Sequence, residues 1–397
     1  MTKKSFQPNM AHHYANNIPF LNELEPELIN SRLEIDLNAL HNNLNYLKSL
    51  SSNKTKLMAV VKADAYGHGF IEIALETQKS ELANYLGVAN VAEAKILRQA
   101  GINIPILVLG TVFPHQLIYA FKYDIETILT NKQNVIDAEK IAFENNIKGK
   151  VHIKIDSGMG RVGVRPEKLD ELLLELTKST NLELVGIMTH FAESENNDFT
   201  FTNQQTRVFK ECIEKVKIYG FKDFIIHCAN SSATLIHPET YFDMTREGLA
   251  MYGVGDPPDK NLIPVLSLKS KIVSLKNIPK GNSLGYGRSF FTKRDSIIGI
   301  IPVGYADGFP RVLSNNQDVL INGKRYPIVG NISMDQSLID LTDCSEVKIG
   351  QEVILIGKSD NDEIKVEEWA KKSYKIPYEV LCGFGNRLPR LYVDNND

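Results

Sequence analysis

A lysine at the end of an apolar run is the residue of this sequence best placed to do chemistry. Leu57–Val61 are five consecutive apolar residues, enough for a buried strand, and Lys62 follows them directly. Beside a dry pocket the pKa of a lysine falls below its free value of about 10.4, which makes a neutral amine available for Schiff-base chemistry. A strand-end lysine is more often a surface residue. However, Tyr66 adds a phenolic donor, and Gly67 and Gly69 let backbone approach a ligand closely. The stretch therefore favours a lysine that binds pyridoxal phosphate (PLP).

The elements that would position Lys62 follow a regular alternation. Leu33–Leu37 is typical of a strand, and four leucines up to Leu47 then recur at helical spacing. Short apolar runs separated by helical patterns come next, and the last of them is polar. Strands that alternate with helices in this way predict an α/β fold with an N-terminal (β/α)8 TIM-like barrel. The eight expected strands are Leu57–Val61, Tyr85–Ala89, Pro105–Leu109, Ile125–Leu129, Val151–Ile155, Leu184–Met188, Phe224–Cys228 and Asp243–Arg246.

From residue 265 the pattern becomes mostly β. Several strand-like segments follow one another, an Asn322-Gly323 pair marks a hairpin turn, and one helix is expected near Val366–Lys372. We therefore predict three regions: an N-terminal extension over residues 1–30, a PLP-binding barrel over 31–264 and a mostly β C-terminal domain over 265–397. The expected strands lie at Leu266–Leu275, Ile297–Val303, Val319–Tyr326, Ser337–Leu341 and Val353–Ile356.

Polar residues gather where the expected barrel strands end. In a (β/α)8 barrel the reactive residues come from the C-terminal ends of the strands, and phosphate sites favour the loops after the last two strands. A serine there could bind phosphate or cap a helix, and both roles can hold together. The residues at these strand ends are Lys62, Lys154, Arg161, His190, Asn230, Ser231, Arg246 and Gly248.

Arg246 has a distinct chemical consequence if it lies beside a pyridine ring, although it could equally be structural. A guanidinium stays protonated, so it would donate to the ring nitrogen of PLP and keep that nitrogen unprotonated. The ring would then be a weak electron sink, which suits proton exchange at Cα better than transamination.

Composition excludes several other classes of function. The 397 residues are 43% hydrophobic and 23% charged with a net charge of −3, as in an ordinary globular protein, so nucleic acid is not an expected partner. The four cysteines are widely spaced, which is typical of reduced thiols rather than disulfides or a metal site. The sequence shows neither a signal peptide nor an apolar stretch of membrane-spanning length. We expect a cytoplasmic protein that does not bind membranes.

Several motifs resemble those of the alanine racemase family. The stretch V-V-K-A-D-A-Y-G-H-G resembles the PLP-lysine motif of that family, and further motifs match it in the same order over roughly residues 31–392. They are K-I-D-S-G-M-G-R-V-G, M-T-H-F-A, H-C-A-N-S-S-A, R-E-G-L-A-M-Y-G, L-G-Y-G-R, P-V-G-Y-A-D-G, G-N-I-S-M-D-Q and R-L-P-R.

The resemblance implies a role for each matching residue. Lys62 would bind PLP and act as one catalytic base, and Tyr286 would be the second base, reaching the substrate from the partner subunit of a homodimer. Arg161 and His190 would assist Tyr286, and Lys154 matches a lysine that is often carbamylated. Racemisation needs an acid and a base on opposite faces of Cα, which explains two such residues. The cofactor contacts would be Tyr66, Asn230, Ser231, Arg246, Gly248 and Leu249, and the substrate contacts would be Arg161, Tyr305 and Met334.

Two positions depart from the family pattern, and three other functions stay open. Asn386 stands where some members have a tyrosine that contacts the phosphate, and Ser333 stands where some have cysteine. A racemase of serine or of a broader set of amino acids would use the same chemistry in a roomier pocket. A decarboxylase would need an acidic partner for the ring nitrogen, where Arg246 stands. A non-catalytic PLP-binding protein would need only the barrel. The resemblance favours racemisation of L- and D-alanine, which would supply D-alanine for peptidoglycan.

Overall fold

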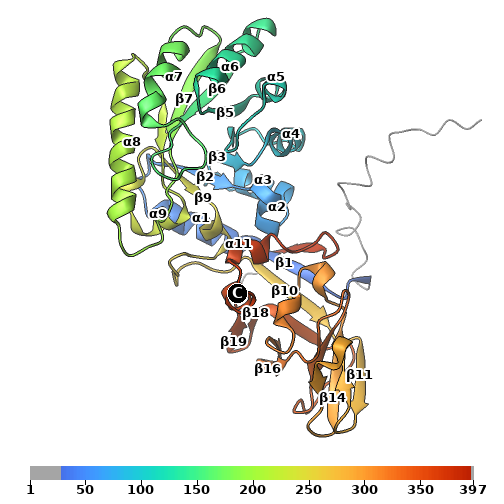
Figure 1. Cartoon of the computed structure of the whole chain (residues 1–397). Helices are drawn as coiled ribbons and strands as arrows, with labels where there is room; N and C mark the ends of the chain where they lie inside the picture. Colours follow the sequence, from blue (N-terminus) through green and yellow to red (C-terminus); the bar gives the residue numbers. More distant parts are fainter. Residues whose placement is uncertain (1–27, 395–397) are drawn as a thin grey trace, which may run out of the picture. The chain divides into compact units, whose positions relative to one another are not determined.

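The computed structural model describes residues 28–394, which form two compact units (Figure 1). One unit comprises residues 37–265, and the other combines residues 28–36 with residues 266–394. The extension predicted for residues 1–30 lies almost wholly outside the described range. Within residues 28–394, no helix is both long and apolar enough to cross a membrane.

The unit of residues 37–265 is built on an eight-stranded parallel sheet with the order β8-β7-β6-β5-β4-β3-β2-β9. Its two end strands approach each other, because Asp243 N donates to Ile226 O and Arg246 N donates to Ala229 O, both at 3.0 Å. The predicted barrel is confirmed, including its polar last strand. The strands are β2 (Lys56–Val60), β3 (Tyr85–Val88), β4 (Ile106–Val108), β5 (Ile125–Leu129), β6 (Gly149–Lys154), β7 (Leu182–Met188), β8 (Ile225–His227) and β9 (Met244–Glu247).

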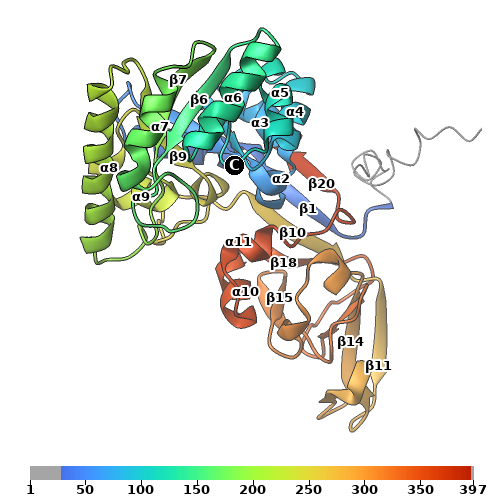
Figure 2. The same cartoon turned by 45° about the horizontal axis from the view of Figure 1, so that its top comes forward.

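Helices follow the barrel strands and cover the outside of the sheet (Figures 1 and 2). The predicted leucine spacing is confirmed in the first helix, where Leu40, Leu44 and Leu47 are fully buried. The helices are α1 (Leu37–Ser49), α2 (Lys62–Gly67), α3 (Phe70–Lys79), α4 (Val91–Gln99), α5 (Pro114–Lys122), α6 (Lys132–Glu144), α7 (Leu169–Leu176), α8 (Thr200–Ile218) and α9 (Ser231–Ile236), with 3₁₀ turns at Pro166–Lys168, Pro238–Thr240 and Leu249–Tyr252.

The second unit is mostly β, as predicted. Its largest sheet has seven strands, in the order β16-β15-β18-β10-β1-β20 with β19 beside β18, and the strands β11-β14-β17 form a smaller sheet. The expected helix is α10, and Pro377–Leu381 adds a second one, α11. The remaining elements are β1 (Arg32–Asp36), β10 (Leu266–Lys271), β11 (Ser274–Ile278), β12 (Ser283–Leu284), β13 (Phe290–Phe291), β14 (Ser296–Ile301), β15 (Asp318–Ile321), β16 (Lys324–Pro327), β17 (Ser337–Asp340), β18 (Glu352–Ser359), β19 (Asp362–Ile364), α10 (Val366–Ser373) and β20 (Arg390–Val393).

Strand β1 lies within the residue range that the sequence assigns to the barrel, but it pairs elsewhere. Leu33 faces Leu268 of β10 on one side and Arg390 of β20 on the other. Leu33 and Ile35 alternate with more exposed residues and are fully buried in this sheet. Alternation predicts a half-buried strand but not its partners, because those partners lie more than 200 residues away in the chain.

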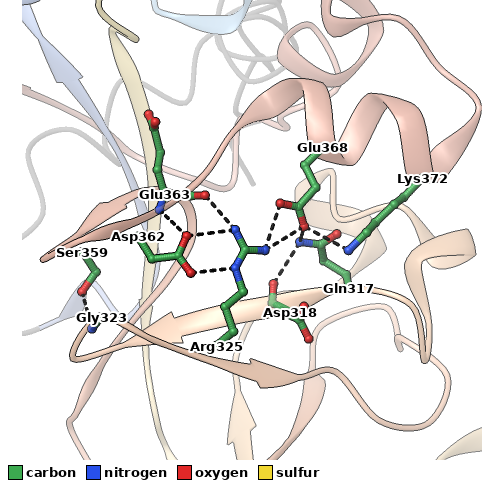
Figure 3. Close-up of polar contacts among 9 residues, drawn as sticks. All are labelled: Gln317, Asp318, Gly323, Arg325, Ser359, Asp362, Glu363, Glu368 and Lys372. Carbon is green, nitrogen blue, oxygen red and sulfur yellow. Dashed lines mark hydrogen bonds and ion pairs between the residues drawn. The ribbon is translucent and has the colours of Figure 1, made fainter.

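A cluster of charged side chains joins β16, β19 and α10 in the second unit (Figure 3). Arg325 donates to both oxygens of Asp362, at 2.8 and 3.1 Å, and to Glu368 Oε2 at 2.9 Å. Lys372 and Gln317 each donate to Glu368 Oε1 at 2.9 Å. Burial alone would raise the pKa of Glu368, but hydrogen bonds from Lys372, Arg325 and Gln317 outweigh it and lower that pKa. The positive charge of Arg325 is thus matched by two carboxylates.

Candidate active site

Lys62 begins a backbone turn of unusual handedness. Strand β2 ends at Val60, and the four residues Ala63 to Tyr66 all have φ between 51° and 55°. Such left-handed conformations cost roughly 1–2 kcal/mol for each residue other than glycine. Strain of this size persists only where the surrounding structure over-determines the conformation, and it clusters at functional sites. The turn leaves Tyr66 buried, with its ring centroid 5.0 Å from that of Tyr252.

Two carboxylates hold this turn in place. Glu93 of α4 accepts from Ala63 N at 3.2 Å and from Ala89 N, just after β3, at 2.7 Å. Asp64 accepts from Phe70 N, at the start of α3, at 3.0 Å. The turn that begins at Lys62 is therefore tied to the helices α3 and α4.

A small polar cradle lies around Gly248, after the last barrel strand. The Ser231 hydroxyl accepts from Gly248 N at 2.8 Å and from Ala250 N at 3.3 Å. A Cβ placed on Gly248 would lie 2.7 Å from the hydroxyl oxygen of Tyr66 and 3.9 Å from that of Ser231. Only glycine leaves this space open. The cradle brings together predicted phosphate contacts from the segments that follow β2, β8 and β9.

Asn230 and Leu249 flank this cradle. The Asn230 side chain caps α9 by accepting from Ala233 N at 3.0 Å, and it also accepts from Ser194 Oγ at 2.8 Å. Leu249 begins the 3₁₀ turn that follows Gly248 and is 2% exposed. Asn230 therefore supports the backbone next to Ser231 through its side-chain oxygen, which already accepts two hydrogen bonds.

Arg246 is buried, and its partners are neutral. Its Nη2 donates to the carbonyls of Thr189 and Cys228, both at 2.9 Å. The imidazoles of His190 and His227 each accept from it through Nδ1, at 3.3 and 3.4 Å. Burial lowers the pKa of Arg246 to about 10, so the guanidinium keeps its charge at neutral pH. Within residues 28–394, none of these hydrogen bonds ends on a carboxylate.

Further cations lie near Arg246. Lys154, Arg161 and His190 line one small pocket at the ends of β6 and β7. Burial, followed by the charges of Arg246, Arg161 and Lys62, lowers the pKa of Lys154 to about 7. The same causes lower the pKa of His190 well below its usual value, so its imidazole is neutral. The structure thus gathers Lys62, Lys154, Arg161, His190 and Arg246 in one electropositive region, as expected for strand-end residues.

The predicted residues of the C-terminal domain form a group in the second unit. Tyr305 N donates to Ser333 O at 3.0 Å, and Ala306 N donates to Met334 O at 3.1 Å. The Asn331 side chain donates to Tyr286 O at 2.7 Å, which joins Tyr286 to the same loop. The side chains of Tyr286, Tyr305 and Met334 are 73%, 43% and 52% exposed. Three residues from separate motifs thus lie together with accessible side chains.

Comparison with known proteins decides the family. The family models for the N-terminal and C-terminal domains of alanine racemase match residues 35–256 and 265–392. The chain is 40% identical over 365 residues to the alanine racemase of Halothermothrix orenii. The aligned region covers 90% of this chain and 96% of that protein. The chain belongs to the alanine racemase family.

Solved structures of alanine racemases have the same fold. The structure of alanine racemase from Bacillus anthracis with bound L-Ala-P aligns with a TM-score of 0.87 at 36% identity, covering 94% of this chain and 97% of that one. The Bartonella henselae alanine racemase with covalently bound pyridoxal phosphate aligns with a TM-score of 0.83 at 31% identity, covering 92% and 99%. The expected family and fold are both confirmed.

The alanine racemase barrel also holds polar core residues that the sequence analysis did not single out. Glu126 and His152 lie inside β5 and β6 and are 3% and 0% exposed. Each ionisable side chain lies directly beside an apolar residue in its strand, which is a signal that sequence inspection can use. Gly186 of β7 gave no such signal, because a glycine in a strand has several explanations.

Proposed function

We propose that this chain is a PLP-dependent isomerase that interconverts L-alanine and D-alanine. The observation that carries the proposal is the presence, in one barrel, of the strand-end Lys62 and the buried Arg246 with neutral hydrogen-bond acceptors. When bound, PLP supplies an electron-withdrawing ring that makes the Cα proton of an amino acid acidic. The residues of this chain then decide where the proton leaves and returns.

The barrel residues fit PLP at three points. Lys62 would hold it covalently through Nζ. Gly248 leaves open the space beside Tyr66 Oη and Ser231 Oγ where a phosphate group would be bound, with Asn230 and Leu249 shaping the backbone around it. Arg246 would donate to the ring nitrogen and keep it unprotonated, which disfavours the side reactions of a stronger electron sink.

Two bases on opposite faces would move the proton. Lys62 Nζ would act on one face of Cα, and the partner subunit's Tyr286 Oη would act on the other. Tyr286, Tyr305 and Met334 are exposed in the single chain, which supports a homodimer in which they serve the neighbouring barrel. Arg161 and His190 would assist the tyrosine by hydrogen bonding, and Tyr305, Met334 and Arg161 would contact the substrate.

A carbamate on Lys154 would balance the charge of this region. Carbon dioxide adds to a neutral amine nitrogen, which releases one proton to solvent, and a pKa of about 7 leaves part of the Lys154 amine neutral at physiological pH. The product carries a negative charge, so it would replace one of several neighbouring cations by an anion able to orient Arg161. A native mass higher by one carbon dioxide per chain is the expected result, and a plain lysine mass would contradict it.

Alanine as substrate is tested by chiral chromatography of L-alanine, L-serine and L-lysine incubated separately with the purified protein and PLP. Rapid conversion of alanine alone to the racemate is expected. Comparable turnover of serine would make the enzyme a broad-specificity racemase. Ser333 is a reason to test this, because it stands where some family members have cysteine. Binding of PLP without any racemisation would instead show a non-catalytic PLP-binding protein. Conversion of alanine would place the protein in the cytoplasmic supply of D-alanine for peptidoglycan.

A further inference from the structure

A chain of buried side chains leads from Arg246 through the barrel core to a carboxylate. Arg246 Nη1 lies 3.4 Å from His227 Nδ1, and His227 Nε2 lies 3.0 Å from His152 Nδ1. His152 Nε2 in turn lies 2.7 Å from Glu126 Oε2. None of these four residues is more than 4% exposed. Glu126 also accepts a long hydrogen bond, 3.5 Å, from the Tyr85 hydroxyl.

A glycine makes the contact between the two histidines possible. His152 belongs to β6 and His227 to β8, and β7 lies between these strands in the sheet. Gly186 of β7 is paired with His152, and a Cβ at Gly186 would lie 2.1 Å from His152 Nδ1. Because any side chain there would displace the imidazole, Gly186 leaves the gap through which the rings meet. Gly186 does not have positive φ, so the requirement is one of space alone.

The positions of the protons along this chain follow from its two ends. A guanidinium can only donate, so His227 Nδ1 must accept and the proton of His227 must lie on Nε2. That proton makes His152 Nδ1 an acceptor, and the proton of His152 therefore lies on Nε2 and faces Glu126. A carboxylate can only accept, so every contact is satisfied by two neutral imidazoles in a single tautomer.

We propose that Glu126 is a positioning residue for Arg246, acting through His152 and His227. As the terminal acceptor it stabilises the tautomers in which His227 presents a lone pair, rather than an N–H, to the guanidinium. The reversed tautomers would place two N–H groups against each other at Arg246. This inference rests on the proposed function only in the consequence for PLP: a guanidinium that loses its His227 partner holds the ring nitrogen less well.

The tautomers can be measured directly by ¹⁵N NMR of the histidine-labelled, PLP-loaded protein, since the protonated and unprotonated nitrogens of a neutral imidazole have well separated shifts. We expect protons on Nε2 of both His152 and His227 in the unaltered chain. Glu126→Met removes the acceptor and should populate a second tautomer, whereas Glu126→Gln keeps an acceptor oxygen and should restore the first. Glu247→Gln is a matched control, because Glu247 is buried next to Arg246 in the chain but accepts its hydrogen bond from Thr234 Oγ1, outside the path from Arg246 to Glu126.

The consequence for chemistry is measured as pyruvate released by side transamination per alanine racemised. In Glu126→Met this ratio should rise about tenfold or more, by analogy with the 10–100-fold effects of residues that orient metal-bound histidines. Gly186→Ala should act in the same direction, and Glu126→Gln should lie near the unaltered chain. If Glu126 had only a structural role, Glu126→Met would lower the stability of the protein without changing the histidine tautomers or the ratio of pyruvate to racemised alanine.

The outcomes separate this inference from the proposed function. Reversed or doubly protonated imidazoles in the unaltered chain would overturn the inference, even if no variant folds. Unchanged tautomers and an unchanged ratio of pyruvate to racemised alanine in Glu126→Met would also overturn the inference. That result would leave the proposed racemisation of alanine unaffected. The expected tautomers in a protein that does not racemise alanine would support the positioning of Arg246 by Glu126 and reject the proposed function alone.

Discussion

Arg246 of the barrel and Arg325 of the second unit are both held by several hydrogen bonds, but their partners differ in charge. Arg325 donates to two carboxylates, Asp362 and Glu368, whereas Arg246 donates to carbonyls and neutral imidazoles. An arginine whose charge is matched by neighbouring carboxylates stabilises the fold. An arginine whose hydrogen-bond partners are neutral has a positive charge that can still attract a ligand. The hydrogen-bond partners of an arginine therefore indicate whether it serves stability or function.

The lysines near these arginines show the same contrast. Lys372 donates to Glu368, whereas Lys154 lies among cations that help to lower its pKa to about 7. A protein that gathers like charges loses stability, which is reasonable only where a ligand or a modification compensates. The following variants test this contrast.

The largest effect is expected for Lys62→Ala. Loss of Nζ removes both the covalent attachment of PLP and one base, so the rate of alanine racemisation in each direction should fall by at least about 10⁴-fold. The visible absorbance of bound PLP should vanish as well. Lys372→Ala, in the charge-paired region, should keep both. Comparable rate losses in the two variants would contradict the view that Lys62 serves catalysis and the charge-paired Lys372 serves stability.

Tyr286→Phe should lower the rate by about 10²–10⁴-fold, as expected for loss of one general acid–base group. PLP absorbance and thermal stability should be unchanged, because the Tyr286 side chain is 73% exposed. Tyr374→Phe is the control, since Tyr374 is 92% exposed and has no proposed role. Tyr286, like Arg325, belongs to the second unit. Full activity in Tyr286→Phe would therefore mean that only barrel residues take part in catalysis.

The pH dependence of stability should reveal Lys154. Its folded pKa of about 7 is lower than the ordinary lysine pKa of 10.5, so between these values the unfolded chain binds more protons than the folded one. Stability should therefore rise with pH in this interval, by up to about 1.4 kcal/mol per pH unit. Denaturant unfolding in carbon dioxide-free buffer should show this slope relative to Lys154→Met. Equal slopes would mean that burial and the neighbouring cations do not lower the pKa of Lys154.

The smallest effect is expected for Arg325→Met. Loss of the bonds to Asp362 and Glu368, which are partly screened by solvent, should lower the free energy of unfolding by about 1–2 kcal/mol. Racemisation should be unaffected. Arg294→Met removes an exposed pair with Asp343 and serves as the control, with no measurable change expected. A loss of activity in Arg325→Met at unchanged stability would reverse the assignment of the two regions.

Much of the fold could be predicted because its signals are local. Five apolar residues before Lys62 predict β2, the leucine spacing predicts α1, and Asn322-Gly323, both at positive φ, predicts the turn between β15 and β16. The partners of β1 could not be predicted, since they depend on Leu268 and Arg390, far away in the chain. The left-handed turn after Lys62 was also missed, because only Asp64 among Ala63 to Tyr66 is of a type that favours positive φ.

The sequence by itself determined the family, the order of the strands and the residue types at their ends, because motifs and hydrophobic periodicity are properties of the chain. Only the tertiary structure decided what surrounds those residues. Neutral partners for Arg246, a pKa of about 7 for Lys154 and the path from Arg246 to Glu126 all arise from groups that lie on, or directly after, different strands. Burial and electrostatic coupling act through space, so they could not be read from spacing along the chain.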